Sequence, residues 1–217
     1  MIYEALLTNA GYLFLIINTL VFTISYNVKN KEQKYFIMYL ILCFTVQMFS
    51  GFLSDLRQNN LFLSHYFFIG QFIFLSLFFS TFYRFKNIIR SFTFLVALSF
   101  IFYLNLNTEI YKKWSVIEIA VTSIPLIIYS LLFFVKKISD NKDNKYIYFN
   151  TGFFLYTLCS TLIFSLGNIG TRELKFYVWK INNLLYFIFQ VLIFIEWYKN
   201  FRKSLTLKNN LIDTKTK

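Results

Sequence analysis

The sequence has few charged residues. Only 15% of its 217 residues are charged, whereas soluble domains carry roughly 25%. Hydrophobic residues make up 57% of the chain, and 30 residues are phenylalanine. A soluble protein of this length has too little interior to hide so much apolar surface from water. The composition therefore argues against an ordinary soluble domain and favours lipid as the solvent.

Histidine and cysteine are also scarce. The single histidine, His65, cannot form a zinc site alone, because zinc takes three or four protein ligands. Cys43 and Cys159 lie inside apolar runs without metal-binding or disulfide spacing. The apolar runs hold no paired Asp, Ser–His or His–Glu cluster of the kind used by intramembrane hydrolases. We therefore expect free thiols, no metal, no cofactor, no catalytic residues and no enzymatic activity.

Long apolar runs dominate what is present. Seven segments approach the roughly 20 residues that a helix needs to cross the hydrocarbon core. They cover residues 7–26, 35–53, 61–83, 88–106, 114–135, 146–166 and 177–198. Helices are required, because lipid cannot satisfy exposed backbone N–H and C=O groups. We predict an all-α, integral membrane seven-helix bundle over residues 1–200, followed by a basic, flexible cytoplasmic tail over residues 201–217.

Basic residues are unevenly distributed between the predicted loops. The net charge is +12, and 16 of the 22 Lys and Arg residues follow segments one, three, five and seven. Because basic loops stay in the cytoplasm, the N-terminus is predicted outside and the C-terminus inside. Abundant Ile, Asn, Lys and Phe suggest an AT-rich bacterial genome, and hence a bacterial inner membrane. The basic clusters are short and lack an aromatic face, so no nucleic-acid partner is expected.

Polar and ionisable residues near the outer ends of the segments are the first candidates for a binding site, since ionisable groups are costly in lipid. This candidate outer mouth consists of Asp55, His65, Gln71, Glu118 and Lys180. Together they would line a polar pocket that faces outward, and His65 would add a group that titrates near neutral pH. In the alternative interpretation, Glu118 pairs with Lys180 only to pack helices, and the other charges lie in headgroups and water.

Uncharged amides inside the segments form a second set of candidates. Buried amides usually hydrogen-bond to a neighbouring membrane helix. We expect such interhelical contacts from Asn18, Gln47, Asn150, Asn182, Asn183 and Gln190. Gly152 and Ser160 would allow close helix approach, and Glu196, next to Trp197, would be an anchor at the inner interface.

Three stretches carry a resemblance to known proteins. They are NNLFLSHYFFIGQFIFLSLFFSTFYR (59–84), YIYFNTGFFLYTLCSTLIFSL (146–166) and VWKINNLLYFIFQVLIFIEWYK (178–199). They resemble small seven-span membrane proteins common in Bacteroidota, which look like stand-alone versions of the membrane halves of sensor proteins. The resemblance implies a sensor membrane domain. That group often has an acidic residue where this chain has Gln71, so the resemblance implies no charge-dependent role there.

The favoured function is therefore a sensor or receptor-like module in the lipid bilayer. The loops are too short for a signalling domain, so a protein partner at the cytoplasmic face, or a homo-oligomer, would receive the signal. One alternative is a transporter or pore-forming accessory protein, for instance in an anti-phage defence system, with a polar seam of Asn150, Asn182 and Asn183. Another is a lipid-active enzyme that depends on Glu118.

Overall fold

The computed structural model describes residues 2–107, 115–140, 144–167 and 171–202. Side chains at 2–5, 140, 164–167, 172 and 174–175, and the predicted tail beyond residue 202, lie outside the described part. The elements are α1 (Ile2–Ile24), α2 (Lys31–Asp55), α3 (Phe62–Ser80), α4 (Lys86–Leu106), α5 (Val116–Asp140), α6 (Ile147–Gly167) and α7 (Arg172–Asn200). Each predicted apolar segment overlaps one of these helices, so the prediction of an all-α chain with seven helices is confirmed for the described residues.

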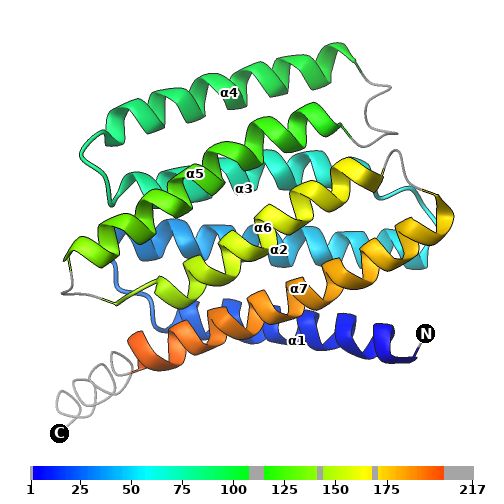
Figure 1. Ribbon diagram of the computed structural model, residues 1–217, viewed down its shortest axis with the longest axis horizontal. Coiled ribbons are helices and arrows are strands. Elements are labelled where there is room, and N and C mark those ends of the chain that lie inside the picture. The colour runs from blue at the N-terminus through cyan, green and yellow to red at the C-terminus, as the bar shows by residue number, and fades with distance from the viewer. Residues whose placement is uncertain (1, 108–114, 141–143, 168–170, 203–217) are drawn as a thin grey trace, which may run out of the picture.

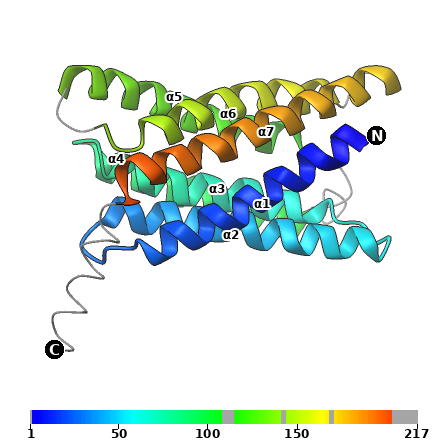
Figure 2. The ribbon, with the colours of Figure 1, turned by 90° about the horizontal axis from the view of Figure 1, so that it is seen from below.

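The helices lie side by side and alternate in direction (Figures 1 and 2). Helices α1, α3, α5 and α7 begin at the end of the bundle where the chain starts, and α2, α4 and α6 end there (Figure 1). We call this the N-terminal end of the bundle. The opposite end, where α7 finishes, is the C-terminal end.

Six of the helices form a closed ring. Helix α1 packs on α2, α2 on α3, α3 on α5, α5 on α6, α6 on α7, and α7 on α1. Helix α4 stands outside this ring and packs against α3, where Ile69 meets Phe100 and Leu104 (Figure 1). The interior of the ring is therefore the place where a buried site can form.

The exterior of the bundle is strongly apolar. Leu13, Phe94 and Leu162 are each more than half exposed, and many other large apolar side chains share this property. Within the described residues, six helices are long and apolar enough to cross a membrane. The described apolar stretch of α6, Ile147–Ile163, is shorter. Because water would not tolerate such a surface and lipid does, the architecture indicates a multi-pass membrane protein.

Polar side chains fasten the connections between successive helices. Gln33 is buried, donates from Nε2 to the carbonyl oxygen of Ser25 at 3.0 Å, and accepts from the backbone N–H of Asn27 at 3.1 Å. At the other end of α2, Asn60 donates to the hydroxyl of Ser50 at 2.9 Å. The Gln33 bonds pair backbone groups that follow the end of α1, and the Asn60 bond ties the α2–α3 connection to α2.

Glu196 caps α6 from the neighbouring helix α7. Its side chain is fully buried inside the bundle. The carboxylate accepts from the backbone N–H of Tyr146 at 2.6 Å and of Tyr148 at 3.0 Å, and from the amide of Asn200 at 2.6 Å. A helix N-terminus presents unpaired N–H groups and a positive dipole end, which compensates for burial of the carboxylate.

Candidate functional site

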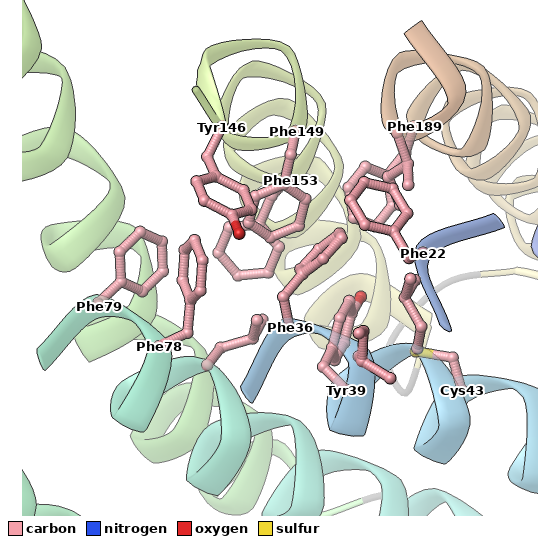
Figure 3. Close-up of a cluster of buried hydrophobic side chains, with 14 of the residues drawn as sticks. Phe22, Phe36, Tyr39, Cys43, Phe78, Phe79, Tyr146, Phe149, Phe153 and Phe189 are labelled. Atoms are coloured by element: carbon pink, nitrogen blue, oxygen red, sulfur yellow. The ribbon is translucent and has the colours of Figure 1, made fainter. Parts of the chain in front are cut away.

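Aromatic rings fill the interior of the ring toward the C-terminal end (Figure 3). Phe149 packs against Phe36 at 4.5 Å and against Phe78 at 5.5 Å between ring centroids, both edge to face. We call the following buried residues the aromatic plug: Phe22, Phe36, Phe78, Phe79, Phe133, Tyr146, Phe149, Phe153, Phe189 and Phe201. Phe201, the first residue of the predicted tail, belongs to this plug. The plug draws on all six ring helices or their ends and closes this half of the ring.

The other half of the interior holds a cavity of about 390 Å³. This volume lies within the roughly 300–1,000 Å³ typical of small-molecule sites. On α2 the cavity extends from Tyr39 to Ser50, which is about 16 Å of helix at 1.5 Å per residue. That is about half of a hydrocarbon core of roughly 30 Å. Asn60 and Leu61 of the α2–α3 connection also line the cavity, so it reaches the N-terminal end of the bundle.

Three tyrosines form the floor of the cavity, and they rest directly on the plug. The ring of Tyr39 lies 6.4 Å from that of Phe149, and Tyr156 stacks on Phe189 at 5.5 Å with 13° between the ring planes. Tyr186 packs against Tyr156 at 5.8 Å. The cavity is therefore a dead end. It stops at these tyrosines, and the plug follows directly toward the C-terminal end of the bundle.

The lining of the cavity combines apolar and aromatic side chains with uncharged amides and hydroxyl groups. The amides are Gln47, Asn60, Gln71, Asn182 and Asn183. The hydroxyl groups are those of Thr8, Ser50, Ser64, Ser123, Thr157, Ser160 and Thr161, besides the tyrosines. Among the described residues, no Asp, Glu, Lys, Arg or His lines the cavity. Such walls suit an uncharged molecule, because a charged one would lose its hydration without gaining a counter-charge.

The predicted outer-mouth residues are distributed over several places. Gln71 lines the cavity. Asp55 is exposed at the end of α2, and the Lys180 ammonium lies 4.0 Å from the ring centroid of Phe176 on its own helix. His65 and Glu118 lie between α3 and α5, behind the cavity wall. Within the described chain, these residues do not make up one pocket.

His65 and Glu118 form a buried pair. Nδ1 of His65 is hydrogen-bonded to Oε2 of Glu118, and each residue is only 1% exposed. Glu118 therefore pairs with His65, and the predicted pairing with Lys180 is wrong. The physical reason is the ring order, since α5 packs on α3 and α6. The pair lies beside the cavity, because the neighbouring residues Ser64 and Ile119 line it.

Four of the predicted interhelical residues form hydrogen bonds between helices. The amide of Asn18 on α1 donates to Oε1 of Gln190 on α7 at 2.9 Å, and to the Gln190 carbonyl oxygen at the same distance. Asn150 on α6 donates to the Ser130 carbonyl oxygen of α5 at 3.1 Å and accepts from the Ser130 hydroxyl at 2.8 Å. Asn183 on α7 donates to the hydroxyl of Thr8 on α1 at 3.3 Å.

Two buried polar atoms at the cavity have no hydrogen-bond partner in the described chain. They are Oδ1 of Asn182 and Oγ1 of Thr157. Asn182 is 6% exposed and Thr157 is 2% exposed. Leaving a buried polar atom without a hydrogen-bond partner typically costs the folded state about 1–3 kcal/mol. A ligand that supplied the missing hydrogen bond would remove this cost. Gln47 lines the cavity on the α2 side.

Sequence reasoning did not single out the floor tyrosines or Thr157. Tyrosine is common throughout the chain, with 16 residues, so Tyr156 offered no contrast. The available signal was spacing. Tyr156, Thr157, Ser160 and Thr161 follow each other at intervals that place them on one helical face.

The described residues contain no group of three or more His, Cys, Asp or Glu side chains that could hold a metal ion. No protein-family model, no curated protein and no solved structure matches the chain. Its function has to be argued from the cavity and the plug.

Proposed function

We propose that the protein is a receptor-like sensor module of a bacterial inner membrane, which binds a small molecule in the cavity and signals through a separate partner protein or a second copy. In this arrangement all seven helices cross the bilayer, with the N-terminus outside. The antiparallel place of α6 beside α5 and α7 supports a crossing by α6 as well (Figure 1). Lys29, Arg84 and Lys86 are exposed at the C-terminal end, in agreement with a cytoplasmic face there.

The observation that carries this proposal is the dead-end cavity. A pore needs a polar path from one face to the other, whereas here the aromatic plug lies beneath the tyrosine floor. A receptor needs a ligand site and a physical connection from that site to the opposite face. Tyr39 and Tyr156 supply such a connection, because each lines the cavity and also packs against a ring of the plug.

The transporter alternative requires the polar seam of Asn150, Asn182 and Asn183 to be continuous. Asn182 and Asn183 line the cavity, but Asn150 bonds to Ser130 within the plug half. Along α6, Asn150 lies six residues from Tyr156, the nearest residue of that helix in the cavity lining, or about 9 Å. Phe153 lies between them and is fully buried in the plug. This interruption favours a receptor over a pore.

The native Cys43 allows a direct test of transmission, because its thiol lines the cavity. In a Cys159→Ala background, N-ethylmaleimide bound to Cys43 would place a small group inside the cavity. We expect hydrogen–deuterium exchange of the protein in lipid nanodiscs to change at the C-terminal end as well, around Gln33 and Tyr146. Gln33 lies beyond the plug from the adduct, at the start of α2, and Tyr146 belongs to the plug next to the start of α6.

The control is the same adduct on the lipid-facing side of α4, at Leu95→Cys in a chain without Cys43 and Cys159. Leu95 is 63% exposed and lies outside the ring. Distant exchange changes from the Cys43 adduct, but not from the Leu95 adduct, would support the proposal. Changes confined to the cavity lining, or a Cys43 that does not react, would contradict it.

The proposed orientation has its own test. Gln58 lies in the α2–α3 connection at the N-terminal end, and Val28, 81% exposed, lies in the α1–α2 connection at the C-terminal end. In spheroplasts, a membrane-impermeant maleimide should label Gln58→Cys and spare Val28→Cys until the cells are opened. The reverse pattern, or labelling of both from outside, would rule out the orientation.

A further inference from the structure

We propose that the cavity binds an uncharged molecule that combines an apolar ring with at least one O–H or N–H donor. This inference names the ligand class of the proposed receptor site and therefore rests on the proposed function. Three features of the cavity carry it: its two unpaired polar atoms, its lack of charge, and its aromatic walls.

The unpaired atoms require a ligand that donates a hydrogen bond. An amide oxygen accepts hydrogen bonds and cannot donate them, so Oδ1 of Asn182 needs an O–H or N–H partner. The Thr157 hydroxyl on the adjoining helix α6 can donate or accept.

The described lining of the cavity offers no counter-charge to a charged ligand. No charged side chain of the described chain lines it. The ionisable pair beside it, His65 and Glu118, is hydrogen-bonded within itself behind the wall. A carboxylate or ammonium group entering about 16 Å along α2 would therefore be desolvated without a counter-charge.

The walls supply surfaces for a ring. The ring centroids of Tyr156 and Tyr186 lie 5.8 Å apart at the floor of the cavity. Phe67, Phe68 and Trp179 also line the cavity. Aromatic side chains hold ring compounds by offset or edge contacts at about 4.5–7 Å between centroids. A cavity of about 390 Å³ has room for a compact ring system.

Three naphthalenes test the inference, because they share one ring system and differ in one group. 2-Naphthol carries a neutral O–H donor, naphthalene has no polar group, and 2-naphthoate carries a negative charge. The readout is protection of Cys43 from N-ethylmaleimide in Cys159→Ala protein in nanodiscs, with free concentrations corrected for partition into protein-free nanodiscs. We expect 2-naphthol to protect at a free concentration roughly three- to tenfold lower than naphthalene, and 2-naphthoate to give no protection in that range.

Two variants connect this difference to the proposed atoms. Asn182→Leu should abolish the advantage of 2-naphthol over naphthalene, and the isosteric Thr157→Val should reduce it. Asn18→Leu makes the same chemical change at an amide bonded to Gln190 outside the cavity lining, and should leave the advantage intact. Thr157→Val provides the answer if Asn182→Leu does not fold.

Equal protection by all three compounds, or by none, would overturn the ligand class. So would an advantage of 2-naphthol that survives both Asn182→Leu and Thr157→Val. The Cys43 adduct experiment uses no ligand. A positive adduct result with a negative naphthol result would therefore reject this inference alone, whereas a negative adduct result would reject the proposed function.

Discussion

Replacing His65 with leucine should destabilise the protein far more than replacing His65 and Glu118 together. Both residues are 1% exposed, and Oε2 of Glu118 is hydrogen-bonded to the imidazole. The other carboxylate oxygen has no hydrogen-bond partner in the described chain. In His65→Leu, the whole carboxyl group would remain between α3 and α5 without its partner. In the double leucine variant, neither of these two ionisable side chains remains between α3 and α5.

The expected magnitudes follow from what burial does to ion pairs. Removing one partner of a buried pair typically lowers the free energy of unfolding by about 3–5 kcal/mol, because the remaining group stays buried and uncompensated. Replacing both partners with apolar residues of similar volume is often neutral or stabilising by about 1–4 kcal/mol. We therefore expect a loss of about 3 kcal/mol or more for His65→Leu. The double variant should lie within about 1 kcal/mol of the wild type, or above it.

The assay is reversible unfolding in mixed micelles of increasing dodecyl sulfate content, followed by circular dichroism. Glu118→Gln is the shape-matched control, since it keeps an acceptor toward His65 and should lose less stability than His65→Leu. The cycle also needs Glu118→Leu alone. If the double leucine variant lost as much free energy of unfolding as His65→Leu and Glu118→Leu added together, the reasoning would be refuted. Such additivity would mean that the two side chains do not depend on each other.

Two further predictions concern the contacts of α6 with α7. Alanine at Gly152 would place its Cβ 2.9 Å from the Phe189 ring, so Gly152→Ala should lower the free energy of unfolding by about 1–3 kcal/mol in the micelle assay. Gly51→Ala, with nothing within 4 Å of its Cβ, should be neutral or stabilising by up to about 1 kcal/mol; equal effects of the two would contradict the packing argument. Glu196→Ala should lower stability by about 3 kcal/mol or more, because it removes charge-assisted bonds worth about 1.5–3 kcal/mol each. It should also speed amide exchange at Tyr146, whose N–H donates to that carboxylate, and unchanged exchange there would argue against the cap.

The helices could be predicted from the sequence because the bilayer fixes how long an apolar run must be. The fourth predicted segment, 88–106, corresponds to α4 (Lys86–Leu106), and the fifth, 114–135, corresponds to α5 (Val116–Asp140). In these cases the run of apolar residues ends at basic or polar groups, and the backbone inside it has no alternative to helical hydrogen bonding. Length and composition therefore decide the elements without any knowledge of packing.

The partners of the polar residues could not be predicted in the same way, because they depend on the order of helices around the ring. Short connections allow many orders of the helices around a ring. Nothing in the sequence identifies α4 as the helix that stands outside it. Once α3 lies next to α5, His65 rather than Lys180 becomes the partner of Glu118. The amides show the same limit: Asn150 bonds to α5, whereas the equally buried Asn182 lines the cavity.

The dead-end cavity nevertheless has a counterpart in the sequence, namely the order of polar and aromatic residues along each helix. On the inner face of α2 the chain runs from Phe36 in the plug to Gln47 at the cavity. On α3, which points the opposite way, it runs from Ser64 at the cavity to Phe78 in the plug. Helices α6 and α7 repeat this inversion. Because antiparallel neighbours reverse this order, the cavity-lining amides and hydroxyl groups meet at one end of the bundle and the rings of the plug at the other. A pore would need polar residues along the whole inner face of its helices, so this alternation separates a one-sided site from a channel before any helix is placed in space.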